Sequence, residues 1–264
     1  MTTPTTHSAD GTTIAYQAYG DGPAIVIVGG AVNRKEDWAE LAQALAAEGF
    51  TGMTYDRRGR GGSGDTTPYA VEREIEDLAA VISATSGSAG VLGVSSGGAL
   101  ADRAASAGLP ITALSTFETP YRVGGDGPLP PTDYLEHLQE LYDADDPGGM
   151  LEYFAIAAVG ESQKQVDQTK QTKFWASMLP LGRTLLYDGL CLGSSGAPLP
   201  NELLSSIGVP MLCVGSTGSP AWLRAGARAS AEAAPDGRYV ELEGDYHSVP
   251  TSVLVPVLAA HHGG

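Results

Sequence analysis

The sequence is short of cysteine, with only Cys191 and Cys213 in 264 residues. The two do not have the spacing of metal ligands, and nothing around them indicates a secreted, disulfide-stabilised chain. We therefore expect neither a disulfide nor a metal site, and we expect both cysteines to pack as small apolar side chains. We predict no cofactor.

Basic residues are also scarce. Lysine and arginine together number 15, against 31 aspartates and glutamates, so the formal net charge is −16 at pH 7. Such a charge repels nucleic-acid phosphates and anionic lipid, and neither nucleic acid nor a membrane surface is expected as a partner. Nothing in the sequence fixes the oligomeric state.

Long apolar runs are missing as well. No run approaches the length of about 18 residues that a transmembrane helix needs. The N-terminal segment MTTPTTHSADG has no basic region followed by an apolar one, so it does not read as a signal peptide. We expect a cytoplasmic protein whose 42% hydrophobic residues form a real core.

A further shortage is local, because the segment 203–231 contains no aspartate or glutamate. With 31 acidic residues in 264, a window of 29 residues would hold about three (29 × 31/264). The position of this segment in the fold decides what its lack of carboxylates means.

Short apolar segments alternate with segments of helical spacing along most of the chain. Predicted strands cover 12–20, 24–28, 52–56, 90–94, 111–117, 209–215 and 238–243, and predicted helices cover 38–50, 70–85, 97–108, 220–234 and 252–262. Strands that alternate with helices predict an α/β fold with a doubly wound, mostly parallel sheet covered on both faces.

The alternation stops after residue 119. Residues 132–189 have helical spacing, many aromatic and long polar side chains, and no strand pattern. We predict that 120–201 is an inserted helical cap, and that 1–119 and 202–264 form the core domain.

The segment 93–97, GVSSG, lies between a predicted strand and a predicted helix. A direct turn from strand to helix forces its central residue into strained backbone angles, and the flanking glycines remove Cβ atoms that would clash. Ser95 is central and is the predicted nucleophile, placed at a helix N-terminus. The alternative is a small-residue turn that only packs the helix on the sheet.

A serine hydroxyl needs a base to become a nucleophile. The sequence has five histidines, His7, His137, His247, His261 and His262. Only His247 follows a predicted strand of the sheet core, at the edge where parallel sheets carry their sites. The others are expected before the first strand, in the cap and in the terminal tail. We predict His247 as the base.

These motifs together resemble the α/β-hydrolase family with a helical cap. The similar segments are VGGAVNRKEDW, YDRRGRGGSG, GVSSGG and EGDYH. The resemblance implies transfer of an acyl group to water through an acyl-serine, with the oxyanion held by the backbone N–H groups of Ser96 and Ala31. The family commonly has His-Gly where this chain has Gly29-Gly30, so we expect a change in how that loop is held.

The resemblance also assigns Asp56, Arg57 and Arg58 to scaffolding, in which a strand-end carboxylate holds a glycine-rich turn through arginine. A different group of residues is predicted to line a substrate pocket, with packing of the cap as the alternative role for its side chains. These residues are Gly30, Phe154, Phe174, Trp175, Met178 and Tyr187.

The third catalytic residue is the difficult one. In this family the acid most often follows the strand predicted at 209–215, where the chain reads GSTGSP within the carboxylate-free segment. Ser219 and Pro220 have instead the pattern of a helix N-cap and first helical residue. The acid must come from elsewhere.

We predict Glu118, which ends the strand beside the elbow strand, as the acid. Neighbouring strands lie about 5 Å apart, and glutamate has one methylene more than aspartate to reach His247. Some hydrolases of this fold, resorcylic lactone hydrolases among them, are similar in placing a glutamate here. Asp245 is the spare candidate, and Gly218→Asp is expected to restore part of the activity that Glu118→Gln loses.

The resulting hypothesis is a serine hydrolase of a small-molecule carboxylic ester or lactone. A mostly apolar acyl or ring portion is expected, because no arginine cluster marks an anionic-substrate clamp in the cap. Ser95 excludes the aspartate-elbow mechanism of dehalogenases and epoxide hydrolases. Lyase, perhydrolase or carbon–carbon hydrolase chemistry stays open, as does a ligand-binding protein with slow turnover.

Overall fold

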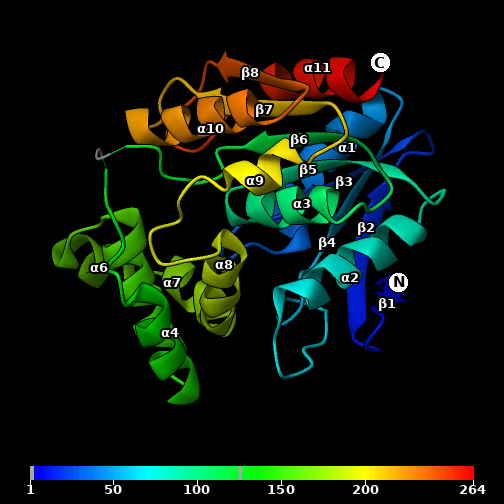
Figure 1. The fold of residues 1–264 in the computed structure, drawn as a ribbon. Coiled ribbons are helices and arrows are strands. Elements are labelled where there is room, and N and C mark those ends of the chain that lie inside the picture. The colour runs from blue at the N-terminus through cyan, green and yellow to red at the C-terminus, as the bar shows by residue number, and fades with distance from the viewer. Residues whose placement is uncertain (1–2, 125–126) are drawn as a thin grey trace.

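Eight strands form one sheet in residues 3–124 and 127–264, which the computed structural model describes. The strands are β1 (Thr5–His7), β2 (Thr13–Tyr19), β3 (Ala24–Val28), β4 (Thr51–Tyr55), β5 (Ala89–Val94), β6 (Ile111–Phe117), β7 (Met211–Ser216) and β8 (Gly237–Leu242). Their spatial order is β1-β2-β4-β3-β5-β6-β7-β8 (Figure 1). The pairs β1–β2 and β2–β4 are antiparallel and the rest are parallel, as the predicted fold class requires.

Helices cover both faces of the sheet. One face carries α2 (Val71–Ser83), α3 (Ser96–Ser106), α9 (Asn201–Ser205) and α10 (Ala221–Ala233), and the other carries α1 (Ala39–Ala47) and α11 (Thr251–His262). In β3, Val26 and Val28 join the first core while Ile25 and Ile27 join the second, because side chains alternate along a strand. The unbroken apolar run is thus what burial on both faces needs.

The site is positioned by three neighbouring strands, β3, β5 and β6. Val28 lies opposite Gly93, and Val94 lies opposite Phe117, so the strands end at the same edge of the sheet. The segments that follow them therefore meet at the carboxyl edge, where parallel sheets carry their sites.

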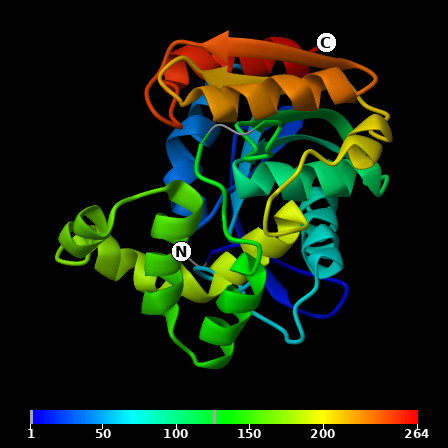
Figure 2. The ribbon, with the colours of Figure 1, turned by 60° about the vertical axis from the view of Figure 1, so that its left-hand side comes forward.

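A separate group of helices stands between β6 and β7 in the chain. It comprises α4 (Tyr134–Asp143), α5 (Pro147–Tyr153), the π-helix Phe154–Val159, α6 (Gln163–Thr169), α7 (Lys173–Met178), the 3-10 helix Leu179–Thr184 and α8 (Leu185–Leu192). These helices have their own apolar core and lie together beside the end of the sheet (Figure 1 and Figure 2). Of the predicted cap, 120–201, residues 125–126 lie outside the described part.

Some elements differ from the sequence-based expectation. His7, expected before the first strand, lies in β1, and α9 was not predicted; both elements are too short for their periodicity to show. His261 and His262, at the end of the predicted helix 252–262, form the last turn of α11, and Nε2 of His262 is 2.8 Å from Oγ of Ser115, so this terminal segment packs against the sheet. No helix of residues 3–124 and 127–264 is both long and apolar enough to cross a membrane.

The two cysteines are buried and unpaired, in α8 and β7. Both belong to the apolar core on the α3 face of the sheet, and Cys213 also accepts a weak hydrogen bond from Thr116 at 3.5 Å. Cys213 packs largely as expected, whereas the thiol of Cys191 also contacts polar groups, with Arg57 and Tyr69 at 3.5 Å and Glu74 at 3.7 Å.

Candidate active site

Ser95 lies on the sharp turn between β5 and α3 that the GVSSG pattern predicts. Its backbone has φ 53° and ψ −125°, which residues other than glycine rarely adopt. A Cβ at Gly93 would lie 2.6 Å from the carbonyl oxygen of Gly97, and one at Gly97 would lie 2.6 Å from that of Gly29. The glycines are therefore required by close backbone approach, and the turn presents the Ser95 hydroxyl at the start of α3.

Glu118 and His247 are in direct contact although they are 129 positions apart in the sequence. Glu118 directly follows β6 and is 0% exposed, and its Oε2 lies 2.7 Å from Nδ1 of His247. An ionised carboxylate only accepts hydrogen bonds, so Nδ1 carries the proton and Nε2 is left as the acceptor. The structure thus brings together the residues predicted as acid and base.

The end of β7 and the carboxylate-free loop after it hold the Glu118 carboxylate. The backbone N–H of Ser216 donates to Oε1 at 2.8 Å, and the hydroxyl of Ser219 donates to Oε2 at 2.8 Å. The Ser219 hydroxyl also accepts from the backbone N–H of His247 at 2.8 Å. The expectation that Ser219 caps the next helix is wrong: Pro220 is the N-cap residue of α10, and the Ser219 side chain serves the Glu118–His247 pair instead.

Asp245, the spare candidate for the acid, does not contact His247. Its residue is exposed, and its backbone carbonyl accepts from the Ser216 hydroxyl at 2.6 Å. The carboxylate of Asp245 makes no hydrogen bond among the described residues, whereas Glu118 contacts the imidazole directly. The geometry therefore favours Glu118.

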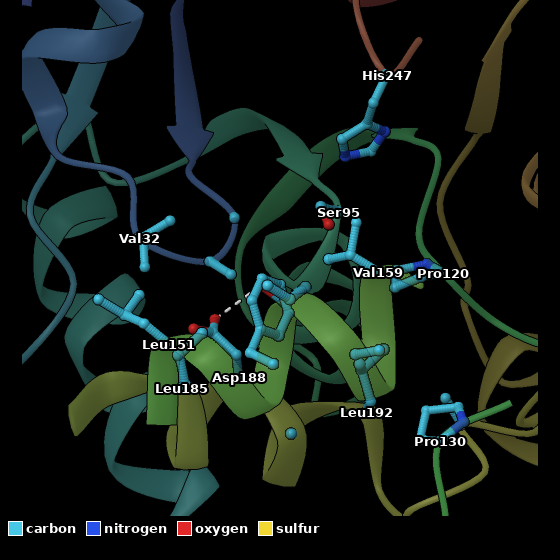
Figure 3. Close-up of a pocket in the computed structure, with 18 of the residues that line it drawn as sticks. Val32, Ser95, Pro120, Pro130, Leu151, Val159, Leu185, Asp188, Leu192 and His247 are labelled. Carbon is cyan, nitrogen blue, oxygen red and sulfur yellow. Dashed lines mark hydrogen bonds between the residues drawn. The ribbon is translucent and has the colours of Figure 1, made fainter. Parts of the chain in front are cut away.

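The His247 ring lies on one side of Ser95, and leucine side chains from α5 and α8 lie on the other (Figure 3). The ring stacks on Phe117, with centroids 5.3 Å apart, and this contact fixes its plane. Among the described residues the Ser95 hydroxyl makes no hydrogen bond. Proton-transfer contacts are commonly long in ligand-free sites and shorten on binding.

Ser95, Glu118 and His247 share an unusual backbone conformation. Their φ angles are 53°, 47° and 50°, and Val32, which borders the same cavity, has φ 52°. Positive φ costs a residue other than glycine about 1–3 kcal/mol and is found mainly at functional sites. Four of the six described residues other than glycine with positive φ thus lie in the segments that follow β3, β5, β6 and β8.

The backbone N–H groups of Ser96 and Ala31 were predicted to stabilise an oxyanion. Ser96 is the first residue of α3, so its N–H has no acceptor within the helix. Gly30 lies against the nucleophile, since a Cβ there would be 2.9 Å from Cβ of Ser95, and Ala31 borders the same cavity. Both N–H groups therefore belong to segments that adjoin the Ser95 side chain, where backbone donors stabilise developing negative charge.

Two buried arginines hold the loop that begins Gly29-Gly30. Nη1 of Arg57 donates to the carbonyl of Gly29 at 3.3 Å, and Nη1 of Arg60 donates to the carbonyl of Gly30 at 2.5 Å. The loop has no histidine of its own at this position. Its support comes from guanidinium groups of the segment after β4.

Asp188 on α8 joins these arginines to the residue beside the nucleophile. Its carboxylate accepts from Arg57 at 2.7 Å, from Arg60 at 2.8 Å and from the hydroxyl of Ser96 at 2.7 Å. Burial would raise the pKa of Asp188, but Arg60 and Arg57 outweigh it and hold the pKa below its ordinary value. One carboxylate from the α4–α8 group thus connects both segments around Ser95.

A cavity of about 500 Å³ opens onto Ser95 and His247. Its wall is mostly apolar and includes five of the six predicted pocket residues: Gly30, Phe154, Phe174, Trp175 and Met178. Trp175 is 8% exposed, whereas Phe174 is 64% exposed and lies at the rim. In the π-helix, the small side chains of Ala155 and Ala158 also border the cavity.

Tyr187 does not border the cavity, contrary to the prediction. It is 1% exposed, stacks on Tyr69 with ring centroids 3.8 Å apart, and donates to Asp65 at 2.9 Å. The next residue, Asp188, borders the cavity instead. Successive helical residues point about 100° apart, so an aromatic pattern without known packing cannot tell which of the two faces the site.

Sequence reasoning missed several residues of the cavity wall, among them Asp188, Arg122, Trp222 and Tyr246. Two of them carried a positional signal, because Tyr246 directly precedes His247 and Arg122 closely follows the Glu118 strand end. No local pattern distinguishes the other two. The sequence analysis expected no cluster of arginines in the cap. Among the described arginines, Arg122 alone borders the cavity.

The scaffolding role expected for Asp56, Arg57 and Arg58 agrees with their contacts. Asp56 accepts directly from the backbone N–H of Gly62 at 2.8 Å, so the carboxylate holds the glycine-rich turn without an arginine between them. Arg58 pairs with Asp77 through two hydrogen bonds of 2.7 Å. All these charged side chains are buried and paired.

The fold and the elbow geometry match a known family. The sequence profile of the alpha/beta hydrolase family matches residues 25–256. The chain belongs to this family. A solved alpha/beta hydrolase from Sphaerobacter thermophilus is 44% identical to this chain, over 98% of this chain and 99% of its own, with a TM-score of 0.90.

Other members of the fold are more distant in sequence. The enol-lactonase from Burkholderia xenovorans LB400 is 21% identical, with 97% of each chain covered and a TM-score of 0.70. The esterase from Exiguobacterium antarcticum is 19% identical, with 100% of each chain covered and a TM-score of 0.75. No curated protein sequence matches the chain.

Proposed function

We propose that this alpha/beta hydrolase is a serine hydrolase of carboxylic esters or lactones with a mostly apolar acyl or ring portion. The observation that carries the proposal is the 2.7 Å contact between Glu118 and His247 beside the elbow residue Ser95. The mostly apolar cavity in front of them supports an apolar substrate. The fold is shared with an esterase and an enol-lactonase, whose names describe this kind of chemistry.

In the proposed reaction, Nε2 of His247 takes the proton from Ser95 as its oxygen attacks the ester carbonyl. The tetrahedral intermediate places its oxyanion at the N–H groups of Ser96 and Ala31. As the bond to the leaving oxygen breaks, the imidazolium returns the proton to that oxygen, and an acyl-serine remains.

A water molecule then replaces the leaving group. His247 takes one of its protons, the hydroxide attacks the acyl carbon, and the Ser95 oxygen leaves with the proton that His247 returns. Throughout, Glu118 keeps Nδ1 protonated and stabilises the imidazolium, which forms twice per turnover. Segment 120–201 acts as the cap that shapes the substrate cavity.

A fluorophosphonate probe tests the proposal, because it reacts covalently with an activated serine. The probe should label the parent protein, and Ser95→Ala should abolish labelling and ester turnover without lowering the melting temperature. Ser194→Ala, which changes another serine of the same cavity, is the matched control and should do neither. A parent protein that is not labelled, and that only binds esters across a panel of acyl lengths, would be a ligand-binding protein.

A further inference from the structure

Arg122 is the one arginine in the described residues that borders the cavity of Ser95 and His247. It lies in the segment that leaves β6, four positions after Glu118. Its backbone N–H donates to the carbonyl of Ala197 at 2.8 Å, and it forms an isolated β-bridge with Pro198. These backbone contacts fix the position of Arg122 in the cavity wall.

The guanidinium of Arg122 has no charged partner among the described residues. Its Nε and Nη1 are buried and make no hydrogen bond, and its Cζ lies 3.4 Å from the centroid of the Trp222 ring. By contrast, the buried arginines Arg57 and Arg58 have carboxylate partners at 2.6–2.7 Å. An unpaired cation that has lost part of its water is costly, so Arg122 differs in kind from the scaffold arginines.

Arg122 remains charged at neutral pH. Burial lowers its pKa to about 10, still well above 7. The stacked Trp222 ring stabilises the cation but, unlike a carboxylate, leaves the in-plane N–H groups without acceptors. The guanidinium thus keeps its charge at the wall of a mostly apolar cavity, where ion pairing is stronger than in water, and its accessible donor is Nη2, the one nitrogen that is not among the buried ones.

The remaining charge at this wall limits what Arg122 can bind. Glu161 also borders the cavity, and no ion pair joins it to Arg122 among the described residues. Tyr246, next to His247, also borders the cavity; burial and then Glu118 and Glu161 raise its pKa, and Arg122 lowers it. One cation with a carboxylate nearby favours a ligand group of a single negative charge over a dianion such as phosphate.

We propose that Arg122 binds a carboxylate of the substrate, so that the enzyme acts on esters or lactones carrying one free carboxylate beyond an apolar spacer. This inference rests on the proposed function for its ester chemistry. A carboxylate can accept from the guanidinium through Nη2, and Ser95 and Arg122 border one cavity of about 500 Å³. The apolar lining between them takes the spacer.

Matched pairs of activated esters test the inference. Each pair consists of the mono-4-nitrophenyl ester of a linear dicarboxylic acid and the same compound with a carboxamide in place of the free carboxylate, over a series of spacer lengths. For the parent enzyme, kcat/KM should favour the acid over the amide by about tenfold to a hundredfold at the best spacer length. A preference for the amide at every length would overturn the proposal.

Variants separate recognition from a structural role. Arg122→Gln should lower kcat/KM for the acid about tenfold or more and leave the amide nearly unchanged. Arg228→Gln is the matched control, because Arg228 is also stacked on an aromatic ring, Tyr239 at 4.3 Å, but does not border the cavity. If Arg122→Gln lowered kcat/KM equally for the acid and the amide, Arg122 would only support the position of Trp222, and the proposal would be overturned.

Binding measurements keep the inference testable if Arg122→Gln does not fold or if ester turnover is absent. Calorimetry of the parent protein with an uncleavable diamide and its monoacid counterpart compares the two end groups directly. Tighter binding of the monoacid supports the carboxylate site even if the proposed hydrolysis fails. Equal or weaker binding of the monoacid, or tighter binding of the corresponding phosphonate dianion, rejects it.

Discussion

Ser219 and Glu118 are joined by a 2.8 Å hydrogen bond from the serine hydroxyl to Oε2 of the carboxylate. Ser219 lies in the loop where the acid of this family most often stands, whereas Glu118 lies at the end of the neighbouring strand. With Ser216, the loop supplies two donors to a carboxylate from outside it. A second carboxylate in this loop would repel the buried Glu118, which gives a physical reason for its lack of acidic residues.

Glu118→Gln should reduce kcat by about 10²–10⁴-fold with little loss of fold. The amide has nearly the same shape, but it cannot stabilise an imidazolium by charge, and its NH₂ group can face Nδ1 and select the wrong tautomer. Turnover of a short 4-nitrophenyl ester and the melting temperature measure the two effects. Asp245→Asn is the control and should keep parental activity; the reverse pattern would move the acid to Asp245.

A relocated acid should work at position 219 and fail at position 218. A Cβ at Gly218 would lie 2.5 Å from the carbonyl oxygen of Gly244, so the sequence-based expectation of rescue by Gly218→Asp does not survive the geometry. The Ser219 hydroxyl already lies beside the acceptor oxygen of Glu118. In the Glu118→Gln background, adding Ser219→Asp should raise kcat about tenfold or more. Rescue by Gly218→Asp alone would contradict this.

Asp188→Asn should lower both stability and turnover. The change leaves two buried guanidinium groups without one of their counter-charges, and breaking such pairs costs about 3 kcal/mol. It also loosens the Gly29-Gly30 loop and Ser96 together, so kcat should fall about tenfold even far below the melting temperature. Ser96→Ala removes a single hydrogen bond to the same carboxylate and should affect stability much less. If folded Asp188→Asn kept the parental kcat, Asp188 would contribute to stability alone and not to the geometry of the site.

The buried carboxyl of Asp102 on α3 should make stability pH-dependent. Burial raises its pKa to about 7, although Tyr121 donates to it at 3.1 Å. The unfolded chain has a pKa of about 3.9 here, so the folded state binds the proton more tightly. Its contribution to stability is present below pH 4 and is lost as pH rises towards and through 7.

Asp102→Asn removes this titration. Between pH 4 and 8 the stability difference should shift by roughly 2–4 kcal/mol in favour of the variant. Denaturant unfolding of parent and variant across that range measures the shift, with Glu243→Gln at an exposed carboxylate as the control. A difference that stays constant with pH would show that Asp102 is ionised throughout.

The sequence was sufficient to predict the candidate catalytic residues, because each of them follows the end of a strand. Ser95, Glu118 and His247 each follow a strand of the sheet core, and strand ends can be read from apolar runs and turns. The sequence predicts strained backbone angles at Ser95, but it does not show the positive φ of Glu118 and His247, because neither is a glycine. Ser219 was misread because a local N-cap pattern competed with a tertiary hydrogen bond to a residue 101 positions away.

Helices α4 to α8, the proposed cap, show the opposite case. These helices have no motif, and which side of a helix faces the cavity depends on packing that sequence spacing leaves open. Trp175 was placed correctly on the cavity, while Tyr187 was placed wrongly one residue before Asp188. Helix type was equally hidden, since the π-helix 154–159 has no signature in FAIAAV.

That π-helix should set the upper limit on acyl length. Ala158 borders the cavity with a single methyl group, so Ala158→Leu fills space that a long acyl or ring portion would occupy. We expect kcat/KM to fall about tenfold or more for long-chain esters and to change little for acetate esters, because overlap in a packed wall is costly only when the substrate reaches it.

Ala157→Leu is the matched control for Ala158→Leu. Ala157 is one position away, outside the cavity lining but packed in the apolar core of the α4–α8 helices. Ala157→Leu should lower the melting temperature without changing the ratio of long-chain to short-chain rates. Equal effects of the two variants on that ratio would mean that the π-helix does not contact the acyl group.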